Sequence, residues 1–474
     1  MDQVATEADR WRLIPPVPAV PARSLGLRAF LRAIRTNALT IWPEAAYTQD
    51  FTVRHFLGRM NVLVNAPDAI HRVLVENAEN YRRSPASIRI LRPITGNGLL
   101  LSEGEDWRLQ RRTIAPALAP RVMPMLARHI VAVTAERLDV LAQQAAAGPV
   151  DLLAALQSLT LEIAGRSLFS LEMAAFGAPL RRLLGEFESL SRPFMLDMLL
   201  PPSVPTLRDL RRRRFQARWM GLIEQIMRDR LRAPQPDTPR DLFDLLRAAR
   251  DPETGVGFSP TQLRDQLATL LLAGHETTAL VLFWTLTLLA QDGVEQARVA
   301  AEARGVTIEP DGAVEALGGL VRTRAVVSEA LRLYPPAFAI VREAIGPDRL
   351  GDFELSKHAV VMIAPWVLHR HKSLWRNPAT FDPDRFMPEA PAVPRFSYLP
   401  FGVGPRVCVG AQFALTEAVV VLGLLLQRFE IGMAETQPVL PVGIVTTQPD
   451  RAAEFWLRAV SLREQSSADR IPPG

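Results

Sequence analysis

The chain of 474 residues has a formal net charge of +5, and 48% of its residues are hydrophobic. Length alone suggests two to three domains, but no linker, repeat or low-complexity tract divides the chain. We therefore expect one large, mostly helical domain over residues 1–474. The single cysteine excludes an intrachain disulfide and fits a reducing compartment.

The N-terminal region predicts neither a secretory signal nor a membrane anchor. Residues 1–24 form a proline-rich lead with early acidic residues, and no uncharged apolar run there reaches the roughly 18 residues that a span needs. Residues 25–42 are basic and amphipathic, compatible with a membrane-surface helix but favouring a helix packed on the core. We expect a soluble, cytoplasmic protein.

Residues 50–66 alternate in the manner of two strands, and a short helix is expected from Pro67 to Asn77. Residues 82–101 contain prolines and glycines among apolar side chains, which predicts a loop covering a pocket. In the next segment, Trp107 and Arg111 are four residues apart and would share one face of a helix.

Residues 125–197 show helical patterns, and residues 196–205 break them. Thr206 and Asp209 resemble a capping box that opens a helix to about Arg232. The four arginines at 211–214 indicate a solvated face, because no aromatic interleaving or binding motif accompanies them. We therefore expect no nucleic-acid partner.

A long helix is predicted over residues 259–291, with Ser259, Pro260 and Gln262 as its start signal. About 32 helical residues would span about 48 Å. Its apolar sequence is interrupted by Gly274-His275-Glu276-Thr277-Thr278. Polar residues inside an apolar helix are costly unless they serve a site, and a threonine can bend the helix by bonding back to the i−4 carbonyl.

Further along the chain, Glu329 and Arg332 are three residues apart, and Phe381–Phe386 reads FDPDRF. A strand is expected over residues 337–342, a helix over residues 411–428 and hairpins over residues 437–461. His369, Arg370 and His371 suggest surface or supporting roles, because no carboxylate or cysteine lies near them at metal-ligand spacing. We expect no fused reductase module.

The only cysteine lies in the segment FGVGPRVCVG, residues 401–410. A buried, unreactive thiol is one interpretation. A phosphate-binding loop is excluded, because neither the third glycine of G-x-G-x-x-G nor a Gly-Lys-Ser/Thr is present. Glycines and an arginine around a thiol also suit a soft-metal ligand, since positive charge and a metal lower the thiol pKa.

This segment closely resembles the haem-binding loop of the cytochrome P450 family, F-x-x-G-x-R-x-C-x-G. W-x-x-x-R at residues 107–111, A-G-x-E-T at 273–277, E-x-x-R at 329–332 and the FDPDRF segment resemble further motifs of that family, in the same order. The resemblance covers roughly residues 50–460. It implies an α+β fold, mostly helical with small sheets, in which the long helix crosses the molecule over the haem.

The resemblance also implies site roles. Cys408 would be the axial ligand of haem b (protoporphyrin IX iron). Glu276 and Thr277 would deliver protons during oxygen activation. Glu329, Arg332 and Arg385 would form a structural charge network. The remaining cofactor contacts would be Trp107, Arg111, Ala273, Gly274, Arg342, Phe401, Gly402, Arg406 and Gly410, and the substrate pocket would include Ile94, Ala337, Phe338 and Ala339.

The implied function is a haem-thiolate monooxygenase that hydroxylates, epoxidises or dealkylates an apolar small molecule. It would use O2 and two electrons from NAD(P)H, delivered by a reductase and a ferredoxin or flavodoxin. The alternatives are a peroxygenase or isomerase without a redox partner, and a non-enzymatic haem sensor. Fatty acids, terpenoids, steroids and aromatic compounds all remain possible substrates.

Overall fold

The computed structural model describes residues 12–56, 58–192, 204–232 and 238–460. Its α-helices are α1 (Leu27–Thr36), α2 (Pro67–His71), α3 (Pro85–Thr95), α4 (Gly104–Ile114), α5 (Met123–Ala147), α6 (Leu152–Phe169), α7 (Gly177–Ser191), α9 (Leu207–Arg232), α10 (Leu242–Ala248), α11 (Pro260–Gln291), α12 (Gly293–Arg304), α13 (Ala313–Ala316), α14 (Val321–Leu333), α15 (Pro365–Leu368) and α16 (Ala411–Arg428). Its strands are β1 (Phe51–Phe56), β2 (Arg59–Val64), β3 (Tyr81–Arg83), β4 (Val150–Asp151), β5 (Ile340–Ala344), β6 (Asp348–Leu350), β7 (Phe353–Leu355), β8 (Val360–Ile363), β9 (Phe429–Met433), β10 (Pro441–Gly443), β11 (Thr447–Pro449) and β12 (Glu454–Ala459).

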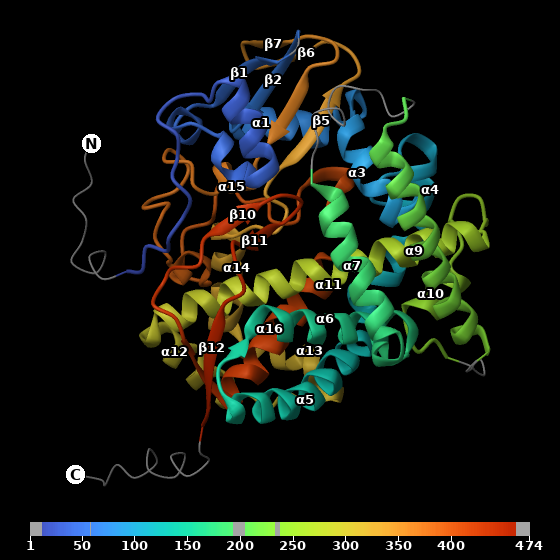
Figure 1. Cartoon of the computed structure of the whole chain (residues 1–474), viewed down its shortest axis with the longest axis vertical. Coiled ribbons are helices and arrows are strands. Elements are labelled where there is room, and N and C mark those ends of the chain that lie inside the picture. The colour runs from blue at the N-terminus through green and yellow to red at the C-terminus, as the bar shows by residue number, and fades with distance from the viewer. Residues whose placement is uncertain (1–11, 57, 193–203, 233–237, 461–474) are drawn as a thin grey trace.

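Helices make up most of the molecule, and the largest sheet lies at one end of it (Figure 1). That sheet has the strand order β1-β2-β8-β5-β3. β2 and β8 run parallel, whereas the other neighbouring pairs are antiparallel. The smaller sheets are β4-β12-β9, β10-β11 and β6-β7. This confirms the α+β architecture with small sheets.

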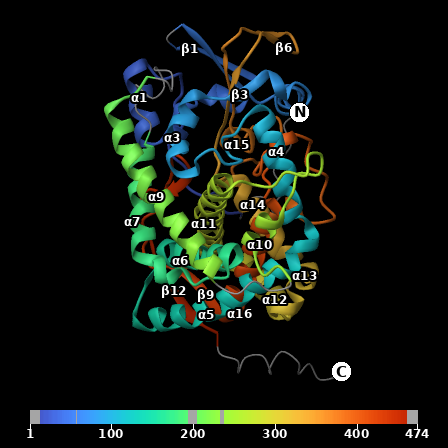
Figure 2. The ribbon, with the colours of Figure 1, turned by 90° about the vertical axis from the view of Figure 1, so that its right-hand side faces the viewer.

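The long helix α11 crosses the middle of the helical part in Figure 1, and Figure 2 shows it nearly end-on among α6, α9, α10 and α14. Ser259 and Gln262 form the capping box expected from the sequence, and Pro260 is the first helical residue. By length and composition α11 and α16 would both be long enough to cross a membrane, but 67% and 56% of their apolar windows are buried inside the protein. Both behave as core helices.

Two expectations from the sequence need correction. The segment 82–101 is not a loop throughout, because residues 85–95 form α3. Ser84 caps this helix by accepting a hydrogen bond from the Ser87 N–H, Pro85 fits its first turn, and Gly96 ends it with a φ of 59°. The strand expected over 337–342 begins only at Ile340. Most of the predicted break at 196–205 lies outside the described residues.

The β10–β11 hairpin is fixed to α11 and to the chain after α14. The indole N–H of Trp284 donates to the Thr447 carbonyl at 2.9 Å, and Thr447 donates from its amide to Pro336 O at 3.0 Å and from Oγ1 to Pro335 O at 2.6 Å. Trp284 also stacks on Tyr334 with ring centroids 4.2 Å apart. The hairpin is therefore held in one register against the central helix.

Candidate functional site

A cavity of about 510 Å³ lies inside the helical part of the protein. The loop before α16, the middle of α11, one face of α4 and the strand β5 all contribute to its wall. Every residue expected from the sequence to hold the cofactor or to catalyse lines this one cavity: Trp107, Arg111, Ala273, Gly274, Glu276, Thr277, Arg342, Phe401, Gly402, Arg406, Cys408 and Gly410.

The loop that carries Cys408 depends on glycine at two positions. Gly402 and Gly404 have φ angles of 71° and 77°, and a Cβ on Gly404 would lie 2.1 Å from the Leu74 carbonyl oxygen. The Cys408 amide donates to Phe401 O at 2.9 Å, which closes the loop. Burial raises the pKa of the Cys408 thiol, while the Gly410 N–H and the charge of Arg111 act in the opposite direction.

Three arginines crowd the cavity beside this loop. Burial, together with repulsion by its neighbours, lowers the pKa of Arg83 to about 9 and that of Arg342 to about 10, and burial also lowers the pKa of Arg406. Glu103 is the carboxylate that offsets them, and it pairs with Arg406 and Arg83. Arg83 Nε is buried, lies 3.9 Å from Glu103 Oε1 and makes no hydrogen bond within the described residues. This excess of positive charge suits an anionic ligand.

Sequence reasoning missed Arg83. β3 pairs with β5 in a register that sets Arg83 opposite Arg342, so the two side chains reach the cavity from adjacent strands. No local pattern marks Arg83 as different from Arg82 before it. The pairing of strands more than 250 residues apart is what brings it to the site.

Trp107 and Arg111 lie on the face of α4 that meets the cavity. The Arg406 guanidinium stacks over the Trp107 ring at 4.4 Å, a cation–π contact. Arg111 Nη1 donates to the Val407 carbonyl at 2.8 Å, next to Cys408. The helix α4 is thus attached directly to the cysteine loop.

The polar centre of α11 opens toward the cavity. Thr277 Oγ1 donates to the Ala273 carbonyl at 2.6 Å, the back-bond expected from the sequence. A Cβ on Gly274 would meet no atom within 4 Å, so this part of the helix presents bare backbone. Glu276 Oε1 accepts hydrogen bonds of 2.8 Å from both Thr446 Oγ1 and Gln448 Nε2.

One buried titratable group belongs to this polar centre, and another lies beside it on α16. Burial lowers the pKa of His275 to about 4, and its Nδ1 has no partner within the described residues. Glu417 on α16 is 1% exposed, neither of its carboxyl oxygens has a hydrogen-bond partner in the described part of the chain, and burial raises its pKa well above the usual value. Its polar neighbour is Thr278.

Of the residues expected in the substrate wall, Ala337 and Ala339 line the cavity, whereas Ile94 and Phe338 do not. Ile94 is fully buried in the core, and its carbonyl accepts a hydrogen bond from Trp219 of α9. Phe338 packs edge-on against Trp42, with ring centroids 6.2 Å apart. Both side chains serve packing because the chain turns them away from the cavity.

A family profile described as Cytochrome P450 matches residues 45–452. The chain belongs to the cytochrome P450 family. It is therefore a monooxygenase of the P450 type, an oxidoreductase that uses O2, and the family implies a haem-thiolate iron. Membership in this family explains why the five sequence motifs occur in the same order as in other P450 proteins.

Bacterial P450 enzymes are among its relatives. Cyclooctatin synthase of Streptomyces melanosporofaciens is 35% identical, over 77% of this chain and 79% of the relative. Pentalenene oxygenase of Streptomyces avermitilis is 30% identical, over 83% and 86%. Cyclooctat-9-en-7-ol 5-monooxygenase of Streptomyces melanosporofaciens is 30% identical, over 72% and 74%.

The cavity suits the haem of a P450 in three respects. A thiol opens onto it, bare backbone at Gly274 and Gly410 leaves room for a flat group, and the Arg83, Arg342 and Arg406 cluster has unneutralised positive charge for two carboxylates. Arg83 Nε, which makes no hydrogen bond in the described part of the chain, points to the same conclusion, because a buried guanidinium N–H normally has an acceptor.

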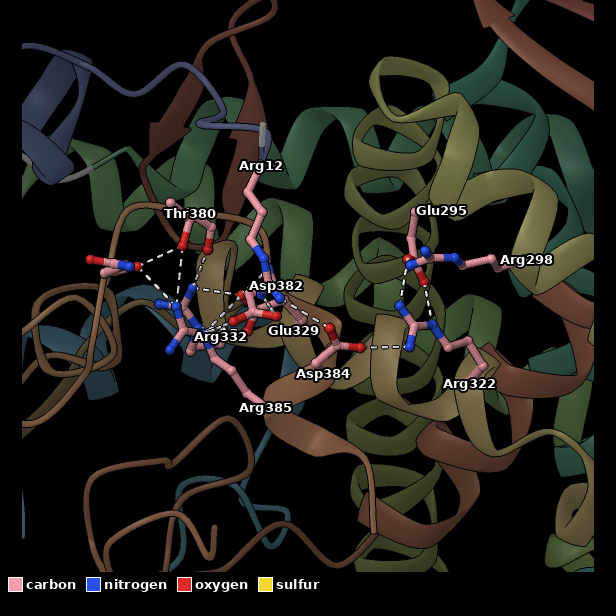
Figure 3. Close-up of polar contacts among 11 residues, drawn as sticks. Arg12, Glu295, Arg298, Arg322, Glu329, Arg332, Thr380, Asp382, Asp384 and Arg385 are labelled. Carbon is pink, nitrogen blue, oxygen red and sulfur yellow. Dashed lines mark hydrogen bonds and ion pairs between the residues drawn. The ribbon is translucent and has the colours of Figure 1, made fainter. Parts of the chain in front are cut away.

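The E-x-x-R and FDPDRF segments meet in a buried charge network (Figure 3). Arg332 pairs with Glu329. It also donates to the carbonyls of His369, Pro378 and Thr380, at 2.7–2.8 Å. Arg385 Nε lies 3.6 Å from Glu329 Oε1. Figure 3 shows the network continuing through Asp382, Arg12, Asp384 and Arg322 to Glu295, so it links the N-terminal segment to α12 and α14.

His369, Arg370 and His371 are all buried rather than at the surface. His369 Nε2 accepts from the Leu399 N–H at 2.8 Å, and burial lowers the pKa of this imidazole to about 3, so it is neutral. Within the described residues no group of His, Cys, Asp and Glu side chains has the geometry of a metal site. His369 thus acts as a neutral acceptor that supports the chain leading into the cysteine loop.

Proposed function

We propose that this P450 oxidises an apolar cyclic compound of the terpenoid class, with Cys408 as the thiolate ligand of haem iron. The observation that carries the proposal is that Cys408 and Thr277, from segments 131 residues apart, line one cavity. When bound, the haem supplies the activation of O2 and the transfer of one oxygen atom. Arg83, Arg342 and Arg406, with Trp107 and Arg111, would hold its propionates.

The overall reaction would be RH + O2 + NAD(P)H + H⁺ → ROH + H2O + NAD(P)⁺. One oxygen atom enters the substrate and the other leaves as water. A separate reductase and a ferredoxin or flavodoxin would deliver the two electrons, in the cytoplasm. Glu276 would transfer protons toward the Thr277 hydroxyl, and Thr277 would hold them at the cavity face of α11. The intact Glu276–Thr277 pair favours this reaction over the peroxygenase and isomerase alternatives.

The wall of the cavity supports an apolar substrate. Three of its polar side chains away from the cysteine loop are already hydrogen-bonded within the protein: Ser87 to Ser84, Gln266 to Gln110 and the Leu99 amide, and Thr269 to the carbonyls of Thr95 and Asp265. The hydroxyls of Ser167 and Thr278, which also line the cavity, are buried and have no hydrogen-bond partner within the described residues. The side chains left to meet a ligand are therefore mainly leucine, valine and alanine, as at Leu91, Leu270, Ala339 and Val445. Two relatives are named after the compounds cyclooctat-9-en-7-ol and pentalenene, and these names fit a ring compound with few polar groups as the substrate.

The carrier would bind a basic face near the cysteine loop. Arg112, next to Arg111 on α4, does not contribute a free charge to this face. Its Nε and Nη2 bind both oxygens of the buried Asp251, at 2.8 and 3.1 Å, and Glu253 lies 2.9 Å from its Nη1. Charge reversal at Arg112 would break these pairs as well as alter the surface.

The test is the absorption spectrum of the purified protein, reduced with dithionite and exposed to carbon monoxide. We expect the red-shifted Soret band of thiolate-ligated haem, and its loss in Cys408→Ser. An unchanged band in the variant would contradict the assignment of Cys408. On the same sample, pentalenene should shift the haem toward high spin more strongly than laurate, and a preference for laurate would contradict the substrate class.

The monooxygenase assignment has its own test. Thr277→Ala should increase the hydrogen peroxide released per NAD(P)H consumed, because the protons then reach O2 in the wrong place. Unchanged coupling would contradict the role of Thr277 and favour a reaction without external electrons.

A further inference from the structure

The carboxylate of Glu276 is held by side chains from the far end of the chain. Thr446 Oγ1 and Gln448 Nε2 each donate to Glu276 Oε1 at 2.8 Å, across 170 and 172 residues of sequence. Within the described residues no arginine, lysine or histidine lies at ion-pair distance from Glu276. Two neutral donors on one hairpin therefore determine where this carboxylate lies.

The hairpin is built to present these two donors together. Thr446, the residue before β11, and Gln448 within β11 both reach Glu276, whereas Thr447 between them makes its contacts elsewhere. Thr447 is the anchored residue, bonded to Pro335, Pro336 and Trp284. From the other edge, Asn37 donates to Pro441 O and accepts from the Gly443 N–H, both at 3.0 Å.

The hairpin tip is also part of the cavity. Ile444–Thr446 connect β10 to β11, and both Val445 and Thr446 line the cavity beside Glu276 and Thr277. The donors that hold the carboxylate thus belong to a rigid element that is in place before any substrate enters. A glutamate has several rotatable bonds, and fixing it in advance removes the entropy cost of ordering it during the reaction.

We propose that Thr446 and Gln448 are positioning residues for Glu276, which orient its carboxylate for proton transfer toward Thr277. The proposal rests on the monooxygenase function proposed above. Without the two donors, the carboxylate would sample other rotamers, and proton delivery would lose its direction. When no substrate is present, more O2 would then leave as H2O2, formed from one O2, two electrons and two protons, in place of the two waters that four electrons and four protons would give.

The experiment compares Thr446→Val, Thr446→Ser and Gln448→Leu in the haem-loaded protein, each also combined with Glu276→Ala. Peroxide released per NADPH oxidised is measured without substrate, with a surrogate ferredoxin reductase and [2Fe–2S] ferredoxin. Thermal unfolding midpoints of the same proteins form double-mutant cycles that need no turnover. The carbon monoxide spectrum verifies that every variant holds haem in the same way.

We expect Thr446→Val and Gln448→Leu each to raise the peroxide fraction at least twofold, and Thr446→Ser to restore the wild-type value because it keeps the hydroxyl. On the Glu276→Ala background neither substitution should change the fraction further, and the shifts in unfolding midpoint should be less than additive. Equal behaviour of Thr446→Val and Thr446→Ser, or fully additive effects, would overturn the proposal. A wild-type protein without the thiolate-type spectrum would contradict the proposed function instead, and the unfolding cycles would still decide whether the contacts to Glu276 exist.

Discussion

Arg332 donates from Nε and Nη2 to the two oxygens of Glu329, each at 2.7 Å, and neither side chain is exposed to solvent. In a buried bidentate pair each charge depends on the other, since water cannot replace the lost partner. The Asp382 amide also donates to Glu329 at 2.8 Å. This single carboxylate therefore fixes the end of α14 to the FDPDRF segment.

Glu329→Gln should lower the free energy of unfolding by about 3–5 kcal/mol, because it leaves the Arg332 charge buried and unpaired. Denaturant unfolding followed by circular dichroism measures the change. The control is Asp352→Asn, which removes an exposed i,i+3 partner of Arg349 at 3.4 Å. We expect less than about 1 kcal/mol there, and equal effects of the two substitutions would contradict a structural role for Glu329.

Arg83→Gln should weaken haem retention, because it removes one of the buried cations that the propionates would neutralise. The transfer of haem from the Arg83→Gln variant to apomyoglobin should be at least several-fold faster than the transfer from the wild type. Arg82→Gln is the matched control, since Arg82 lies next to it on β3 but pairs with Glu343 at 2.6 Å, outside the cavity wall. Equal transfer rates for both variants would exclude Arg83 from the cofactor site.

His275 should make the protein sensitive to acid. Its pKa is about 4 in the folded state, below the usual 6.5, because burial disfavours the imidazolium. As the pH falls below about 6.5, the unfolded chain binds a proton that the folded chain does not, so stability declines by up to about 1.36 kcal/mol per pH unit until about pH 4. His275→Asn should flatten the loss of stability between pH 6.5 and 4.5. The control is His55→Asn, which replaces a histidine whose side chain is exposed on β1.

Glu417 should act in the opposite pH direction. Its folded-state pKa is raised, so above the pKa of the unfolded state the unfolded chain releases a proton that the folded chain keeps, and stability falls as the pH rises. Glu417→Gln should therefore gain stability relative to wild type as the pH rises above the unfolded-state pKa of about 4.3. An infrared band of a protonated carboxyl group, absent from the variant, would confirm the neutral form. A difference that is constant with pH would contradict it.

Much of the site followed from local sequence patterns, because each motif lies within one segment. Thr277 with Ala273, the capping box at Ser259 and the glycines around Cys408 all interact across a few residues, and a short pattern can record such interactions. The same is true of the helix over residues 411–428, which begins and ends where the apolar pattern predicted.

The contacts that could not be predicted from the sequence join residues far apart in the chain. Arg83 reaches the cavity through a pairing of β3 with β5, and Glu276 meets Thr446 only after the chain has returned across the central helix. Ile94 and Phe338 are apolar residues in regions expected to face the substrate, yet both are packed into the core. An apolar side chain fits a pocket wall or a core equally well, so composition does not separate these two places.

Val445 lies at the tip of the β10–β11 hairpin and lines the cavity, next in sequence to Thr446, which binds Glu276. Shortening or replacing this side chain would enlarge the cavity and would also change the packing next to Thr446. Variants selected at Val445 to accept bulkier compounds should therefore spend more reducing equivalents per molecule of product. Leu91 and Ala339 also line the cavity but lie outside the hairpin. Substitutions there could change which substrates fit without altering the hairpin.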